Sequence, residues 1–203
     1  MKKNIFTLVS LVLILMSCTK DGETKLQPYN KIIFSETFTD ANDGDILNTV
    51  NWTNFNEIGN KKWTEQKYQD NGYAEFSSFG SGQLVNTAWL VSPKIDMDLQ
   101  EGEKMNFQVA QNFLRSRENV LEVLVSINYD GSNVAAADWI VVPAITPSPE
   151  TERYKFISSG LIDLSKFKGK LNFAFRVKGS GTNSNLTGTY QLDNISVFYT
   201  IKE

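Results

Sequence analysis

The chain has 203 residues, a formal net charge of −3 and no histidine. This length predicts one domain that is large enough to bury a hydrophobic core without disulfide bonds. The small negative charge excludes the basic surface that nucleic-acid-binding proteins need, so we expect no nucleic-acid partner. The absence of histidine removes the commonest general base and the commonest transition-metal ligand.

Residues 1–17 are expected to form a lipoprotein signal peptide. Two lysines precede an apolar run, residues 5–16, which is too short to cross a bilayer as a helix. The run ends at Leu15-Met16-Ser17-Cys18, which resembles the lipobox of bacterial lipoproteins. The resemblance implies that the single cysteine, Cys18, is lipidated and anchors the chain to a membrane. The alternative is a secreted protein in which this cysteine is simply buried.

Residues 18–30 are expected to tether the lipid to the domain, because they show no apolar periodicity and contain Pro28. The stretch 20–23 resembles the lysine-acidic export tag of surface lipoproteins in Bacteroidetes, although Gly22 interrupts the tag. We therefore expect a lipid-anchored protein of the outer membrane, displayed at the cell surface. The alternative is that these residues are only a solvated linker.

From residue 31 to 203 the sequence predicts an all-β domain. Apolar residues alternate in short runs bounded by Gly, Asn, Asp, Ser and Pro, as in Leu121, Val123, Val125 and Ile127. Such alternation places one set of side chains in a core. No stretch shows sustained helical periodicity, so we expect a jelly-roll sandwich of two antiparallel sheets. The expected strands cover residues 32–38, 62–68, 73–78, 88–92, 105–112, 120–129, 139–142, 154–158, 171–177 and 190–201.

Six segments occur in a fixed order along this domain. They are residues 34–38, 87–96, 121–126, 162–165, 173–176 and 192–197. Together they resemble the cleaved-adhesin and choice-of-anchor J domains, which are similar in shape to MAM and galactose-binding-like domains. The resemblance implies a jelly-roll sandwich of a surface protein with an adhesive or carbohydrate-binding role, although a fold does not fix a function.

The same resemblance implies one structural calcium ion, with Glu36 and Asp193 at the matching positions. Adjacent first and last strands would bring these carboxylates together, and like charges at close range need a cation or a proton. The following loop, with Asp40, Asp43 and Asp45, would complete the oxygen ligands, although its spacing is not that of an EF-hand. Alternatively, Glu36 faces solvent, Asp193 caps a turn and the loop is held by Asx hydrogen bonds.

Four aromatic residues surrounded by polar neighbours are candidates for a sugar-binding platform: Trp52, Trp63, Tyr68 and Tyr73. Trp and Tyr rings stack on the apolar faces of pyranose rings, while polar side chains bond the hydroxyl groups. By contrast, Trp89 and Trp139 lie within apolar runs and are expected in the core.

The sequence offers no nucleophile paired with a histidine, so we expect no such enzyme. A glycosidase needs only two carboxylates, and the candidate clusters are 96/98, 101/103 and the 40–45 loop. An exposed turn before the strand at 105 is the alternative for the first two clusters. The leading hypothesis is therefore a non-catalytic surface module that binds a glycan or a surface protein. The alternatives are a structural subunit of an outer-membrane complex and a carboxylate-only glycosidase.

Overall fold

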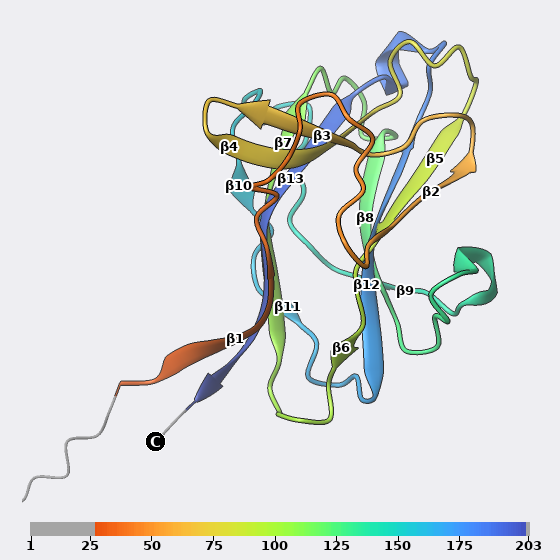
Figure 1. Cartoon of the computed structure of the whole chain (residues 1–203). Coiled ribbons are helices and arrows are strands. Elements are labelled where there is room, and N and C mark those ends of the chain that lie inside the picture. The colour runs from red at the N-terminus through yellow and green to blue at the C-terminus, as the bar shows by residue number, and fades with distance from the viewer. Residues whose placement is uncertain (1–26, 202–203) are drawn as a thin grey trace, which may run out of the picture.

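Alternating apolar and polar residues build two antiparallel sheets that pack face to face, as Figure 1 shows. The computed structural model describes residues 27–201. The expected signal peptide (residues 1–17), Cys18 and most of the expected tether (18–30) lie outside this range. The only helices among residues 27–201 are two short 3-10 turns, η1 (Val134–Ala136) and η2 (Ser184–Leu186). Within that range no helix has the length and apolar character needed to span a bilayer.

The two sheets have seven and six strands. The seven-stranded sheet runs in the order β10 (Ile157–Ser158), β7 (Lys104–Asn112), β13 (Thr189–Ile201), β4 (Asn71–Ser77) and β3 (Thr64–Tyr68), with β1 (Tyr29–Glu36) paired to β13 and β11 (Ile162–Asp163) paired to β7. The six-stranded sheet runs in the order β2 (Thr53–Ile58), β5 (Asn86–Val91), β12 (Lys170–Gly179), β8 (Val120–Ser126) and β9 (Ile140–Val142), with β6 (Ile95–Asp96) paired to β12. The predicted jelly-roll sandwich of antiparallel sheets is confirmed.

The main core lies between the two sheets. In β8 the side chains of Leu121, Val123 and Val125 are buried, as the alternation predicts. Aromatic rings join the layers, since Phe107 of β7 and Phe175 of β12 pack edge to face with centroids 4.9 Å apart. The expectation for Ile127 is wrong: β8 ends at Ser126, so Ile127 lies in the following loop and is 58% exposed.

Each of the ten expected strands coincides with a strand of the structure, but three strands were missed. β2 is interrupted by a bulge and exposes much of both faces, and β6 and β11 have only two residues each. β1 begins at Tyr29, two residues before the expected domain boundary. The expected strand 154–158 retains only Ile157 and Ser158, because Tyr154 has a φ of +59° and leaves the extended conformation.

The first and last strands pair along their whole common length, from Tyr29 opposite Ile201 to Glu36 opposite Ile195. Figure 1 shows β1 and the end of β13 projecting together from the body of the sandwich. After β1 the chain turns at residues 38–41, where the Ala41 N–H donates to the Phe38 carbonyl over 3.0 Å. This turn packs so closely on β4 that a Cβ at Gly72 would collide with the Phe38 carbonyl oxygen.

Trp63 belongs to the core. Its side chain is fully buried and its ring lies 5.8 Å from that of Phe76, centroid to centroid. The prediction that Trp63 forms part of a sugar-binding platform is therefore wrong. The polar residues around it in the sequence are misleading, because Trp63 directly precedes β3 and its backbone bonds to Leu47 and Asn54 turn the ring inward.

Trp63→Ala is expected to destabilise the domain by about 3–5 kcal/mol, because it leaves a large cavity between the sheets. Tyr68→Ala removes a ring that is 70% exposed, so its effect should stay within about 0.5 kcal/mol. Urea unfolding of both variants measures the difference. Equal stabilities would contradict the placement of Trp63 in the core.

Candidate functional site

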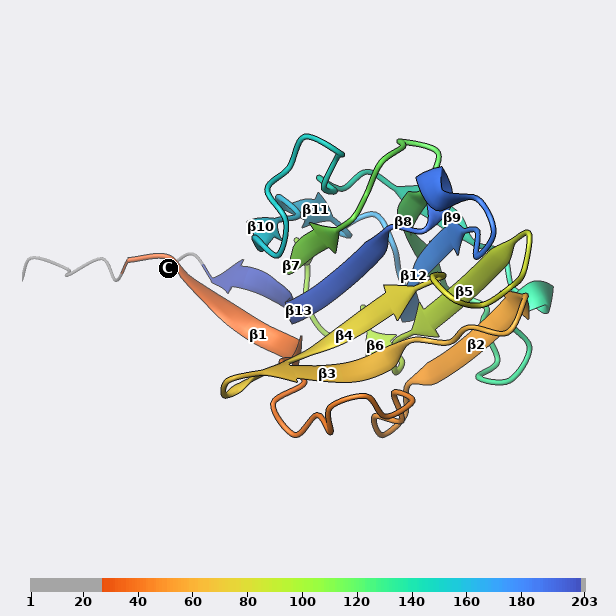
Figure 2. The same ribbon diagram turned by 90° about the horizontal axis from the view of Figure 1, so that it is seen from above.

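An aromatic cleft of about 680 Å³ opens on the outer face of the seven-stranded sheet. Strands β3 and β4 form one wall, the segment leading into β10 forms the other, and β13 lies beneath. Figure 2 shows these strands side by side, with β13 between β7 and β4. Six side chains line the cleft: Tyr68, Asn71, Tyr73, Tyr154, Phe156 and Gln191.

The period of two along β4 and β13 determines which residues reach the cleft. Phe76 of β4 and Leu192 of β13 point into the core. Their neighbours Glu75 and Gln191 therefore face outward, and they lie opposite each other in the ladder. Tyr73 of β4 shares this outer face. The same alternation that builds the core thus builds the cleft.

The first wall is the β3–β4 hairpin. Its two-residue turn begins at Gln69, which has a φ of +55°, and the turn pairs Tyr68 directly with Asn71. Gln66 pairs with Tyr73 one step further along the same face. The hairpin therefore places two tyrosines of different strands on one side of the cleft.

The second wall is the segment 154–156. The Tyr154 N–H donates to the Gln111 carbonyl of β7 over 2.9 Å, and Asn112 Nδ2 donates to the Tyr154 hydroxyl. These bonds hold Tyr154 beside β7 although the residue is 59% exposed. Phe156 follows two residues later on the same side.

The two walls meet where Tyr73 packs edge to face on Phe156, with ring centroids 6.0 Å apart. Partial burial of the Tyr73 phenol, reinforced by the nearby Glu75 carboxylate, raises its pKa above the usual tyrosine value. The phenol therefore keeps its proton, and its hydroxyl can donate as well as accept.

Two carboxylates on the same face of the sheet bond to the amide side chains of the cleft. Gln191 Nε2 donates to Glu75 Oε2 over 2.8 Å, and Asn71 Nδ2 donates to Asp193 Oδ2 over 3.1 Å. Asp193 also accepts the backbone N–H of Asn194 over 2.6 Å and is almost completely buried. Burial raises the pKa of both carboxyl groups, and the hydrogen bonds only partly oppose it.

Of the four predicted platform residues, Tyr68 and Tyr73 line the cleft. Trp52 does not: its ring is half-buried against Phe34, Phe38 and Phe173, with centroids 5.7–6.0 Å apart, and it closes one end of the core. Sequence reasoning missed Tyr154, Phe156, Asn71 and Gln191. The alternation of Tyr154, Lys155 and Phe156 in an expected strand was the available signal, and it indicated one aromatic face.

The structure does not assemble the predicted calcium ligands. Glu36 is near enough to Asp193 for its charge to help raise the pKa of Asp193, but Glu36 Oε1 accepts the Phe38 N–H over 2.8 Å. Asp43 Oδ1 accepts the Lys67 N–H over 2.9 Å, and Asp40 and Asp45 lie exposed in the same loop. Among residues 27–201 no three acidic, cysteine or histidine side chains form a group that could hold a metal ion. The described acidic side chains therefore do not form a calcium site by themselves.

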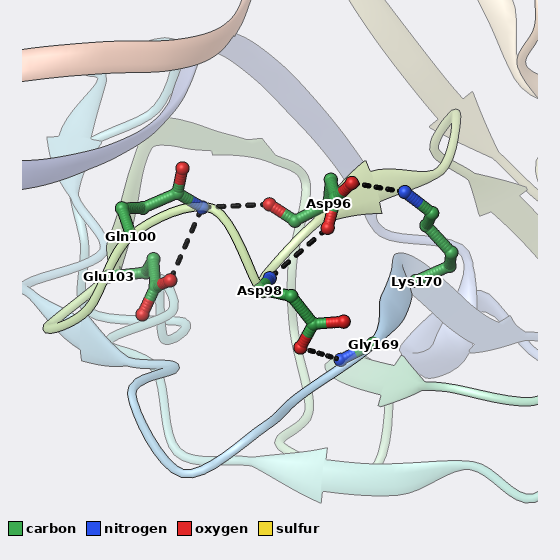
Figure 3. Close-up of polar contacts among 6 residues, drawn as sticks. All are labelled: Asp96, Asp98, Gln100, Glu103, Gly169 and Lys170. Carbon is green, nitrogen blue, oxygen red and sulfur yellow. Dashed lines mark hydrogen bonds and ion pairs between the residues drawn. The ribbon is translucent and has the colours of Figure 1, made fainter.

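Three of the carboxylates considered for a glycosidase, Asp96, Asp98 and Glu103, bond to neighbouring residues around the β6–β7 turn, as Figure 3 shows. Asp96 pairs with Lys170, and this hydrogen bond is the main reason that the pKa of Asp96 is lowered. Asp98 Oδ1 accepts the Gly169 N–H over 2.8 Å, while the buried Glu103 accepts from Gln100 over 3.3 Å. A general acid needs a raised pKa, so Asp96 is poorly suited to that role.

No known family model and no curated protein sequence matches this chain. Solved structures do. The K1 cleaved adhesin domain of Lys-gingipain from Porphyromonas gingivalis W83 is 21% identical with a TM-score of 0.52, and the match covers 81% of this chain and 96% of that domain. The K2 cleaved adhesin domain of Lys-gingipain is 18% identical with a TM-score of 0.54, covering 84% of this chain and 99% of that one. The chain has the fold of a cleaved adhesin domain.

A weaker likeness, with a TM-score of 0.46 and 15% identity, is to a xylan-binding domain of Xyn10C from Paenibacillus barcinonensis; it covers 86% of this chain and 97% of that one. Within the cleaved-adhesin fold, the cleft described here is formed by the outer face of the sheet that contains the first and last strands.

Asp193→Asn is expected to change the pH dependence of stability. Because burial raises the folded-state pKa of Asp193, ionisation costs stability. This cost is absent below the unfolded pKa and appears as the pH rises through the folded pKa. The unfolding free energy of the variant should therefore exceed that of the wild type by an amount that increases over that pH range. Urea unfolding at a series of pH values measures it.

The same two proteins test calcium. Since Glu36 and Asp43 accept backbone N–H groups, a chelator is expected to leave both melting temperatures unchanged. A chelator that lowers the melting temperature of the wild type, but not that of Asp193→Asn, would instead establish an ion at Asp193.

Proposed function

We propose that this protein is a non-catalytic, surface-exposed lipoprotein whose domain binds carbohydrate in the aromatic cleft. One observation carries the proposal: four aromatic rings from two walls converge above the amide side chains of Asn71 and Gln191. The volume of about 680 Å³ lies within the range of small-molecule sites and suits a few sugar rings.

The chemistry of the lining matches that of a sugar. The rings of Tyr68 and Tyr154 are largely exposed and can stack on the apolar faces of pyranose rings. The amides and phenol hydroxyls can bond the equatorial hydroxyl groups. The hairpin turn fixes the backbone at Tyr68, and the bonds to Gln111 and Asn112 fix Tyr154, which reduces the conformational entropy lost on binding.

Binding without cleavage is supported by the state of the carboxylates beside the cleft. Glu75 and Asp193 both accept hydrogen bonds from side-chain amides, and Asp193 is buried. A retaining or inverting glycosidase needs two carboxylates exposed on either side of the scissile bond. Incubation with polysaccharides should therefore release no reducing ends.

The sequence supports the location. The lipobox-like Leu15-Met16-Ser17-Cys18 and the tag-like 20–23 favour a lipid anchor at the outer membrane, with the domain held at the cell surface. We propose membership of the cleaved-adhesin or choice-of-anchor J group on the ordered segments and the shared fold.

Tyr73→Ala and Tyr154→Ala should each weaken glycan binding by at least tenfold, which is about 1.4 kcal/mol. Each removes a ring from one wall of the cleft. The control is Phe79→Ala, which removes the ring of an exposed aromatic residue (74% exposed) outside the cleft. A glycan array followed by calorimetry measures the effect. Silence across all glycans, with co-purification of a membrane protein, would instead favour a structural subunit of an outer-membrane complex.

Cys18→Ser should move the protein from the membrane fraction to the soluble fraction and abolish incorporation of labelled fatty acid, because two or more acyl chains are needed for stable anchoring. Fractionation and labelling of the full chain in a bacterial host measure both effects. A membrane-bound Cys18→Ser protein would contradict lipidation at this residue.

A further inference from the structure

The two amide side chains that line the cleft have fixed orientations. Gln191 donates its Nε2 to Glu75, and Asn71 donates its Nδ2 to Asp193. Each amide has one NH2 group, which donates, and one carbonyl oxygen, which accepts. An ionised carboxylate has no proton to donate, so it can only accept. Rotating either amide would place its oxygen against a carboxylate oxygen. Each amide therefore has a carbonyl oxygen, which is an acceptor, directed away from its carboxylate, and it also keeps the second hydrogen of its NH2 group.

The charges around the cleft have the same sign. Glu75 is half-buried beside the lining residues, and the Asp43 carboxylate acts on both Glu75 and Tyr73. Lys67 alternates with Gln66 and Tyr68 along β3 and so projects from the opposite face of that strand. The basic residues on either side of Tyr154 have partners elsewhere. The Arg153 guanidinium lies 4.6 Å from the centre of the Phe113 ring, and Lys155 Nζ pairs with Glu152 at 3.0 Å. Among residues 27–201, neither Glu75 nor Asp193 forms an ion pair with a lysine or an arginine.

The aromatic lining adds to this negative field. The face of a phenol or phenyl ring is electron-rich and attracts a cation within about 6 Å of its centre. Four such rings and two amide side chains line the cleft, and the Glu75 carboxylate lies next to it, bonded to Gln191. An anionic sugar would be repelled there, and a neutral sugar would leave the carboxylate without a cation.

We propose that the cleft selects glycans that carry free amino groups, that is, polymers or oligomers of amino sugars with a protonated amine, over neutral, N-acetylated and acidic glycans. This inference rests on the proposed carbohydrate-binding function of the same cleft. The ammonium group lies among the Asn71 and Gln191 carbonyl oxygens, near Glu75, while the aromatic rings contact the sugar faces.

The test is calorimetric titration of the soluble domain, residues 27–203, with a glucosamine hexamer, an N-acetylglucosamine hexamer, a glucose hexamer and a galacturonic acid oligomer. We expect the glucosamine hexamer to bind at least about tenfold more tightly than the N-acetylated hexamer at low salt. Raising the salt concentration should reduce this preference, because salt screens an exposed charge pair.

Glu75→Gln should weaken binding of the glucosamine hexamer by about tenfold and leave binding of the N-acetylated hexamer within about twofold. The matched control is Glu101→Gln, which makes the same charge change at an exposed site on the β6–β7 turn and should alter neither affinity. Asp43→Asn is a second variant on the cleft side. The asparagine side-chain oxygen can still accept the Lys67 N–H, so the variant should fold. It should also weaken binding of the glucosamine hexamer.

Equal affinity for the glucosamine and N-acetylglucosamine hexamers would overturn the amine preference while leaving carbohydrate binding intact. The same holds if Glu75→Gln lowers the affinity for both hexamers by the same factor. Binding of no glycan, or binding that Tyr73→Ala does not change, would overturn the proposed function itself. A lysine hexapeptide that binds more tightly than the glucosamine hexamer would overturn the assignment to sugars and show that the cleft takes basic peptides.

Discussion

The register of β13 between β7 and β4 is the constraint on which the site depends. Tyr190 and Leu192 are buried in the core, so Gln191 and Asp193 must face the other way. A slip of one residue would exchange these sets and drive two apolar side chains into the cleft. A bulge after Asp193 then shifts the pairing with β7 and allows the rest of β13 to continue beside β1.

The floor of the cleft shows a conflict between stability and function. Burying Asp193 and partly burying Glu75 disfavours their charged forms, and neither is paired with a basic side chain in the described part of the chain. Neutral residues at these positions would avoid this cost. What the carboxylates supply instead is a fixed direction for the two lining amides, and with it a surface that offers acceptors to a ligand.

The sequence was sufficient to predict the fold class, since the apolar residues of strands such as β8 and β12 alternate over many residues. It failed where alternation was absent: β6 and β11 are too short to show a period, and β2 exposes much of both faces. For the site, the polar surroundings identified Tyr68 and Tyr73 but misplaced Trp52 and Trp63. Local composition cannot show which ring lies between the layers. That depends on partners distant in the chain, such as Phe173 for Trp52.

The pairing of β1 with β13 has a mechanical consequence. β1 joins the expected tether to the domain, and β13 carries the floor of the cleft. A pull that draws Tyr29 away from the body along the strand axis loads the hydrogen bonds between these strands in shear, so they share the force instead of breaking one after another. A lipid anchor at one end and a ligand held at the other would thus be linked through a single antiparallel pair, which suits attachment under flow.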